Sequence, residues 1–192
     1  MKVFPYRRIC VVGTTGSGKS TLAEVLSQRL HIPHVELDAL HWEPGWKEAD
    51  REFTRARLRG IVQNEAWVID GNYSFLRDIL WPRAEAVVWL DYPLPLILWR
   101  LWQRTWRRVI HKEVLWGTNT ERLAEQFFSK DSLFLWALKT YGKQRKNYPA
   151  QFGLPEHAHL QTYHLKSPRQ TAAWLSCLHP GRPHSRNGQP PP

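Results

Sequence analysis

Residues 13–20, Gly-Thr-Thr-Gly-Ser-Gly-Lys-Ser, have the types and spacing needed to hold a chain of phosphates. They match the pattern G-x-x-x-x-G-K-[ST] at every fixed position. Glycines let backbone N–H groups wrap phosphate oxygens, and a helix that follows adds positive potential from its amino end. In such a loop Lys19 reaches the β- and γ-phosphates, and the Ser20 hydroxyl is a ligand for magnesium. We therefore predict a site for ATP or GTP with Mg²⁺, formed by Gly13, Thr14, Thr15, Gly16, Ser17, Gly18, Lys19, Ser20 and Thr21.

The residues on both sides of the loop supply the context that this pattern requires. Residues 9–12 form an apolar run typical of a buried strand. After the loop, Leu22, Val25, Leu26 and Leu30 recur at the spacing of an amphipathic helix. A chance match in a glycine-rich turn is the alternative interpretation. Because a strand precedes the loop and a helix follows it, we favour the phosphate site.

Asp38 and Asp70 each follow a short apolar run. Asp38 has the position expected for a carboxylate near the γ-phosphate, where it would accept a proton from an acceptor hydroxyl or hold a magnesium-bound water. A strand-end aspartate that caps the next segment is the alternative. Asp70 has the form of a carboxylate that holds magnesium through water, and a simple Asp-Gly turn is an equally good interpretation. The predicted metal-binding residues are thus Ser20, Asp38 and Asp70.

Other polar residues near these aspartates have weaker claims to function. His41 is a candidate for orienting a substrate, although a histidine beside Trp42 is more often packed or solvated. Asn72 and Tyr73 follow the Asp-Gly turn and are candidates for substrate contact, with capping as the alternative for Asn72. Asp91, before a Tyr-Pro pair, is expected to be structural.

A basic segment rich in tryptophan, residues 94–111, reads as one helix. Arg100, Arg104, Arg107 and Arg108 lie near one face of that helix. As a lid, the helix would bring guanidinium groups to the transferred phosphoryl group, with Arg100, Arg104 and Arg107 in catalytic roles. Two alternatives remain open: a solvated basic face whose tryptophans pack inward, and a patch for nucleic acid. We favour the lid.

Strand and helix signals alternate along the rest of the chain. Further strands are expected at residues 34–37, 66–69, 84–90 and 160–165, and further helices at 48–64, 119–139 and 168–178, with a functional loop at 41–46. This alternation implies an α/β fold with a parallel sheet covered by helices on both faces. Ligands of such sheets bind beyond the carboxyl ends of the strands, where Gly13, Asp38, Asp70 and Asp91 are all expected.

Length and composition favour one domain with a substantial core, since the chain has 192 residues of which 42% are hydrophobic. We assign this domain to residues 1–178, with the lid at about 100–147. Residues 179–192 are rich in proline and lack apolar periodicity, so they are expected to be a disordered tail.

The charge balance and the cysteines limit the partners and the cellular compartment. With 27 Lys and Arg against 17 Asp and Glu, the net charge of +10 indicates an anionic partner. Cys10 and Cys177 are too far apart in sequence to indicate a disulfide framework or a metal-ligand motif. The run at 9–12 is too short for a signal peptide or a membrane span. We therefore expect a cytoplasmic protein with no membrane partner.

Four sequence blocks, taken in order, resemble the small adenylate-kinase-like P-loop proteins known as DNA topology modulation proteins. The blocks are residues 13–20, 37–46, 67–73 and 88–93, and the resemblance extends to about residue 178. The wider group, the nucleoside monophosphate kinases, implies a three-layer sandwich with a five-stranded parallel sheet and a helical lid.

The resemblance also bears on individual residues. Arg100 and Arg104 resemble the paired arginines that open the adenylate kinase lid. Asp70 begins a block similar to the Asp-Gly-Phe-Pro-Arg block of adenylate kinases, but the last three residues differ here, so its acceptor-binding arginine is missing. The string Asp-x-Leu-His at residues 38–41 is instead similar to small-metabolite kinases such as those for gluconate.

These observations predict an ATP- and Mg²⁺-dependent kinase that moves the γ-phosphoryl group to a small acceptor, either a nucleotide or a hydroxylated metabolite. The alternative is a nucleotide-dependent, DNA-associated regulator with slow ATP hydrolysis, in which the basic helix binds phosphodiester backbone. No DNA-reading motif such as a helix-turn-helix is evident, so a small acceptor is favoured over nucleic acid.

Overall fold

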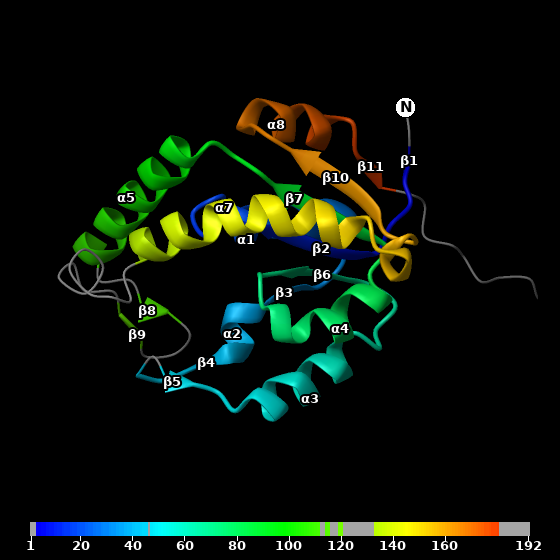
Figure 1. The fold of residues 1–192 in the computed structure, drawn as a ribbon, viewed down its shortest axis with the longest axis horizontal. Coiled ribbons are helices and arrows are strands. Elements are labelled where there is room, and N and C mark those ends of the chain that lie inside the picture. Colours follow the sequence, from blue (N-terminus) through cyan, green and yellow to red (C-terminus); the bar gives the residue numbers. More distant parts are fainter. Residues whose placement is uncertain (1–2, 46, 112–113, 116–118, 121–132, 181–192) are drawn as a thin grey trace, which may run out of the picture.

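A five-stranded parallel sheet forms the centre of the computed structural model, with the strand order β10-β7-β2-β6-β3 (Figure 1). The structure describes residues 3–45, 47–111, 114–115, 119–120 and 133–180. The strands of the sheet are β2 (Arg8–Gly13), β3 (His34–Glu36), β6 (Trp67–Asp70), β7 (Ala86–Leu90) and β10 (Gln161–Leu165). All five strands expected from the sequence are in this sheet, and the predicted α/β fold is confirmed.

Helices connect the strands and cover the sheet. They are α1 (Lys19–Leu30), α2 (Leu37–His41), α3 (Arg51–Ile61), α4 (Arg77–Leu80), α5 (Leu94–His111), α7 (Leu133–Phe152) and α8 (Pro168–Ser176), with the 3₁₀ turns η1 (Ser74–Leu76), η2 (Trp81–Arg83) and η3 (Pro155–His157). Short strands pair outside the main sheet: β1 (Val3–Phe4) with β11 (His179–Pro180), β4 (Trp42–Glu43) with β5 (Lys47–Glu48), and β8 (Val114–Leu115) with β9 (Asn119–Thr120). Among the described helices, none is both long and apolar enough to cross a membrane.

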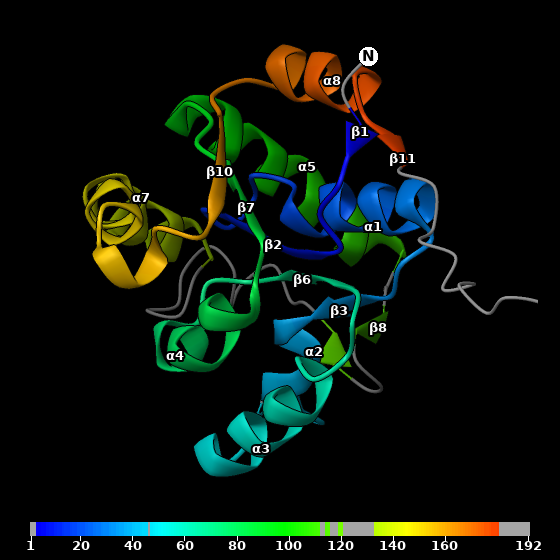
Figure 2. The same cartoon turned by 90° about the vertical axis from the view of Figure 1, so that its right-hand side faces the viewer.

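Both faces of the sheet are buried, because successive side chains of each strand point to opposite sides. On β2, Ile9 and Val11 belong to a core cluster shared with α1, α5, α8 and the first part of α7. Cys10 and Val12 belong to a second cluster shared with α2, α3, α4 and the last part of α7. Figure 2 shows α1 and α5 on one side of the strands and α4 and α7 on the other. The strands are therefore held at fixed positions, and their carboxyl ends meet at one edge of the sheet.

Three local expectations are wrong, each for a physical reason. The loop expected at residues 41–46 is largely regular structure: His41 ends helix α2, which forms because it buries Leu37 and Leu40, and residues 42–43 pair with residues 47–48 in a hairpin. The third helix begins at Arg51 rather than at residue 48, because the Asp50 carboxylate accepts the N–H of Phe53 at 3.0 Å and caps the first turn.

The helix expected at 119–139 is found only in its last part, because residues 133–139 are helical and residues 121–132 lie outside the described residues. Residues 119–120 form β9, and α7 runs from Leu133 to Phe152, through Pro149. Tyr148 is buried in the core cluster that includes Cys10 and Val12, and Ala137 is buried in the cluster that includes α5. This burial holds the helix in place despite residues that disfavour helices.

The segments expected to form the lid and the tail include residues that the structure does not describe. Within the lid at 100–147, residues 112–113, 116–118 and 121–132 lie outside the described residues. Within the tail at 179–192, the backbone of residues 179–180 pairs with β1, and residues 181–192 lie outside the described residues.

Candidate functional site

The glycine-rich loop joins β2 to α1 at the carboxyl edge of the sheet. Gly13, Gly16 and Gly18 all have positive φ angles, of 149°, 81° and 91°. A Cβ atom at Gly13 would lie 2.5 Å from the carbonyl oxygen of Leu90, so only glycine fits there. Gly18 caps α1, and the first N–H groups of this helix face the loop. The loop thus has the backbone of an anion-binding cradle.

Lys19 is the charged centre of the loop. Its Nζ lies 3.4 Å from the carbonyl oxygen of Thr14. Burial lowers the pKa of the Lys19 ammonium, the carboxylates of Asp70 and Asp38 raise it, and the Arg104 guanidinium lowers it further. These effects require Asp70, Asp38 and Arg104 each to lie near the Lys19 ammonium, although the four residues come from α1, β6, α2 and α5. The structure therefore brings Lys19, Asp38, Asp70 and Arg104 to one place.

Asp70, the last residue of β6, faces the start of α1. Its side chain is 5% exposed, and its Oδ2 accepts a hydrogen bond from the Ser20 hydroxyl at 2.8 Å. Its other carboxylate oxygen, Oδ1, lies 2.7 Å from Nε2 of His34 on β3. Asp70 raises the pKa of His34 above its ordinary value, although burial of the imidazole opposes this. The alternative of a simple Asp-Gly turn does not account for these two contacts.

The donor set of Ser20 and Asp70 suits magnesium, since this ion prefers oxygen ligands and is usually held by one or two carboxylates together with substrate phosphates and water. Among the described residues there is no cluster of three or more His, Cys, Asp and Glu side chains that could hold a metal ion by themselves. A metal ion at Ser20 and Asp70 would accordingly depend on the phosphates of the nucleotide for its remaining ligands.

Asp38 lies on α2, next to an aromatic wall. The Tyr73 hydroxyl donates a hydrogen bond to Asp38 Oδ1 at 2.7 Å. The Tyr73 ring lies 4.6 Å from the ring of His41 and 5.8 Å from that of Phe75, centroid to centroid. His41 is buried and also contacts Trp42, which supports the packing interpretation of this residue. The carboxylate of Asp38 is thus held at one end of a surface built from α2 and the segment after β6.

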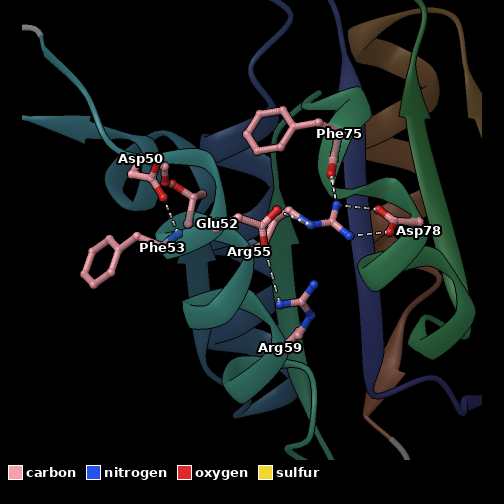
Figure 3. Close-up of polar contacts among 8 residues, drawn as sticks. Asp50, Glu52, Phe53, Arg55, Arg59, Phe75 and Asp78 are labelled. Carbon is pink, nitrogen blue, oxygen red and sulfur yellow. Dashed lines mark hydrogen bonds and ion pairs between the residues drawn. The ribbon is translucent and has the colours of Figure 1, made fainter.

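A salt bridge fastens this surface to α3. Figure 3 shows Arg55 reaching from α3 to the turn that follows Tyr73. Its guanidinium donates to both carboxylate oxygens of Asp78, at 3.0 and 2.6 Å, and also to the carbonyl oxygen of Phe75. A two-pronged contact of this kind restricts orientation as well as distance. Arg55 therefore holds α3 and the segment that carries Tyr73 as one unit.

Asn72 links the glycine-rich loop to α7. Its Oδ1 accepts the N–H of Gly13 at 3.1 Å and the hydroxyl of Tyr148 at 2.9 Å, and its Nδ2 donates to the carbonyl oxygen of Gly13. A second contact comes from the same helix, because the Thr14 hydroxyl donates to Gln144 Oε1 at 3.0 Å. Asn72 acts here on the loop backbone and not as a helix cap.

The arginines of α5 differ in their surroundings. Arg100 donates to the carbonyl oxygen of Ser17 at 3.0 Å, and its guanidinium lies 5.1 Å from the centroid of the Tyr92 ring. Arg104 is half-buried near Lys19, whereas Arg107 is exposed.

The tryptophans of the same helix face outward. Trp99, Trp102 and Trp106 are 57%, 43% and 39% exposed, whereas Ile97 and Leu101 form the buried side. The interpretation in which the tryptophans pack inward is therefore wrong.

Asp91 has a structural environment, as expected. Its buried carboxylate pairs with Nε of Arg145 at 2.9 Å and with Nε2 of His164 at 2.9 Å, and the His164 ring stacks on Trp89 at 4.0 Å. These contacts tie α7 to the ends of β7 and β10.

Four residues of this site had no assigned role in the sequence analysis or only a weak one: His34, Asn72, Gln144 and Tyr148. Asn72 follows the Asp-Gly turn, which is a usable signal. His34 stands at the start of a predicted strand, and Gln144 and Tyr148 belong to the part of α7 beyond residue 139, which was not predicted. Their roles depend on which strands are neighbours and on where α7 crosses the sheet.

A comparison with protein families assigns the chain to a known group. The family model AAA_18, described as an AAA domain, matches residues 9–125, which is more than half of the chain. The chain belongs to this family. Within the matched range lie the glycine-rich loop, Asp38, Asp70 and the arginines Arg100 and Arg104.

Curated members of related groups include kinases of small molecules. A shikimate kinase of Sulfurihydrogenibium sp. is 34% identical over 110 residues, covering 50% of this chain and 66% of that protein. The protein YqaC of Bacillus subtilis, described as uncharacterized, is 29% identical over 130 residues, covering 67% of this chain and 72% of that protein. The predicted class of an ATP-dependent P-loop kinase is confirmed.

Solved structures share the fold across most of the chain. A sugar kinase from Janibacter sp. superposes with a TM-score of 0.51 at 19% identity, covering 90% of this chain and 94% of that one. A shikimate kinase from Acinetobacter baumannii, in complex with shikimate, has a TM-score of 0.51 at 16% identity and covers 90% of each chain. At this level of identity the likeness shows the arrangement of the sheet and its helices.

Proposed function

We propose that this AAA_18 family member transfers the γ-phosphoryl group of ATP to a hydroxyl group of a small, acidic, hydroxylated metabolite. One observation carries this proposal: the ammonium of Lys19 lies within the electrostatic reach of Asp38, Asp70 and Arg104 at the carboxyl edge of the sheet. A phosphate-binding lysine, a candidate base, a candidate metal-binding carboxylate and a candidate lid arginine are the parts that phosphoryl transfer needs together.

Each residue has a defined part in this scheme. The loop amides and Lys19 hold the β- and γ-phosphates of ATP. Asp38 is the base: Tyr73 occupies Oδ1, and Oδ2 accepts the proton of the acceptor hydroxyl. The acceptor oxygen forms a bond to the γ-phosphorus as the bond from that phosphorus to the β,γ-bridging oxygen breaks, which leaves ADP.

Charge stabilisation comes from the residues around the phosphates. Arg100 and Arg104 face the charge that develops on the transferred group, and Arg107 joins them only when α5 moves toward the loop. Ser20 and Asp70 hold the magnesium that accompanies ATP, with Asp38 as a further candidate through water. When bound there, this ion neutralises charge on the β- and γ-oxygens.

The acceptor lies, in this proposal, on the Oδ2 side of Asp38, next to the aromatic wall of His41, Tyr73 and Phe75. An aromatic wall beside a carboxylate suits a compact ring or chain with hydroxyl groups. The net charge of +10 favours an anionic acceptor. The names of the shikimate kinase relatives support the same chemical class.

The narrower assignments rest on sequence. The four sequence blocks support membership in the small adenylate-kinase-like proteins known as DNA topology modulation proteins. We also infer one domain over residues 1–178 with α5 and α7 as the helices of its lid, which is supported by the contact of these helices with each other. The proposed tail covers residues 179–192, although the backbone of residues 179–180 pairs with β1.

The test measures ADP release by the purified protein with ATP and Mg²⁺ against a panel of acceptors. The panel contains hydroxy acids such as shikimate and gluconate, neutral sugars, nucleoside monophosphates and duplex DNA. We expect a hydroxy acid to raise ADP release above the acceptor-free rate and to be recovered as its phosphate. Release stimulated only by duplex DNA would overturn the proposal in favour of the DNA-associated regulator.

Variants with matched controls test whether phosphoryl transfer depends on Lys19 and Asp38. Lys19→Ala is expected to abolish transfer with an unchanged circular dichroism spectrum, whereas Lys139→Ala, at an exposed lysine of α7, keeps the full rate. Asp38→Asn is expected to lower kcat about 10²-fold to 10⁴-fold, since it removes the base without changing shape. Its Kd for ATP should stay within about twofold of the wild-type value. A wild-type rate in Asp38→Asn would exclude Asp38 as the base.

A further inference from the structure

His34 contacts the carboxylate that the proposed function assigns to magnesium. In the pairing of β3 with β6, Glu36 stands opposite Asp70 and His34 opposite Val68. Residues two apart in a strand point to the same face, so the side chains of His34 and Asp70 share the face covered by α1. The imidazole of His34 extends along the strand direction, from its own partner Val68 toward Asp70. Its Nε2 lies 2.7 Å from Asp70 Oδ1.

The two oxygens of Asp70 therefore have different partners. His34 occupies Oδ1, and the Ser20 hydroxyl occupies Oδ2 at 2.8 Å. Because an ionised carboxylate only accepts hydrogen bonds, His34 must carry its proton on Nε2 and act as the donor. Two contacts from opposite sides fix the rotation of the carboxylate plane, which a single contact would leave free.

Because Asp70 and His34 are buried, loss of the hydrogen bond between them would be costly. The side chains of Asp70 and His34 are 5% and 17% exposed, so little water is present to replace a lost hydrogen bond. A buried carboxylate that loses the partner of one oxygen can turn toward another donor, and the charge of the Lys19 ammonium acts on Asp70. Such a turn would take Oδ2 away from Ser20.

We propose that His34 is a positioning residue, which holds the Asp70 carboxylate so that Oδ2 and the Ser20 hydroxyl together face the magnesium of the bound nucleotide. The inference rests on the proposed function, because that assigns Asp70 to magnesium. Partners that orient metal-binding groups in this way commonly change metal affinity by about 10-fold to 100-fold when they are removed.

A structural role alone is the competing explanation, in which the ring merely packs β3 against β6. Two substitutions separate the explanations. His34→Phe keeps a flat ring and its packing but has no N–H donor. His34→Gln places an amide N–H close to the position of the imidazole Nε2, so it restores the donor without the ring.

The experiment measures the binding of Mn²⁺ to the complex of the protein with ADP by electron paramagnetic resonance, and the Mg²⁺ dependence of ADP release. For His34→Phe we expect the Kd for Mn²⁺ and the half-saturating Mg²⁺ concentration to rise about tenfold, with kcat at saturating Mg²⁺ within about twofold of wild type. His34→Gln should recover Mn²⁺ affinity to within about threefold of wild type. Wild-type Mn²⁺ affinity in His34→Phe would refute the proposal, as would equal losses in the two variants.

Asp70→Asn distinguishes failure of this inference from failure of the proposed function. A large loss of Mn²⁺ affinity in Asp70→Asn, with none in His34→Phe, would reject His34 alone. Wild-type Mn²⁺ affinity in Asp70→Asn would reject the assignment of Asp70 to the metal ion, and the role of His34 with it.

Discussion

Truncation of Asn72 tests how the glycine-rich loop is held in place. Asn72→Ala removes the two hydrogen bonds with the backbone of Gly13 and the one from Tyr148. Each such bond contributes about 1 kcal/mol, and the part-buried setting lets water replace some of the loss, so we expect a cost of about 2–3 kcal/mol in the free energy of unfolding. For a domain of this size that lowers Tm by roughly 4–12 °C.

The measurement is urea denaturation followed by tryptophan fluorescence, with differential scanning calorimetry for Tm. Tyr148→Phe is the matched control, since it removes only the hydroxyl that donates to Asn72 Oδ1 at 2.9 Å and should cost about 1 kcal/mol. The double variant should cost about 1 kcal/mol less than the two single costs added together, because they share one bond. A loss below about 0.5 kcal/mol for Asn72→Ala, or strict additivity, would refute this account of the loop.

Two further perturbations test other contacts. Arg55→Lys keeps the charge but loses the two-pronged contact with Asp78. In steady-state kinetics, the KM for the acceptor should rise roughly threefold to tenfold, while the KM for ATP changes less than about twofold. Equal rises in the two KM values would contradict a role of Arg55 confined to the acceptor region. Partial burial raises the pKa of Glu85, but the N–H groups of Arg7 and Arg8 and the guanidinium of Arg8 outweigh it and hold the pKa below 4.5. Because the charged form is the stabilising one, its contribution is complete above pH 4.5 and is lost as the pH falls from there through the lowered pKa. Urea denaturation between about pH 3 and 6 should therefore show a shallower acid decline for Glu85→Gln, and parallel curves would argue against this contribution.

The sequence predicted the strands of the central sheet better than the helices that surround it. All five core strands were expected, since continuous apolar runs such as residues 86–90 are typical of strands buried on both faces. The short helix α2 and the part of α7 after residue 139 were missed. In both segments tertiary packing decides the conformation: α2 buries Leu37 and Leu40, and α7 buries Tyr148 despite a proline next to it.

The sequence by itself determined the parts of the site that are local. The glycine-rich loop needs only a strand, a run of glycines with positive φ and a helix start, and all of these lie within residues 8–30. Side-chain partners were decided by the tertiary structure. Ser20 meets Asp70 because β6 lies next to β2, and Asp70 meets His34 because β3 lies next to β6. Periodicity reports which face of an element is buried, but it carries no information on the order of strands, and that order selects the neighbours across the sheet.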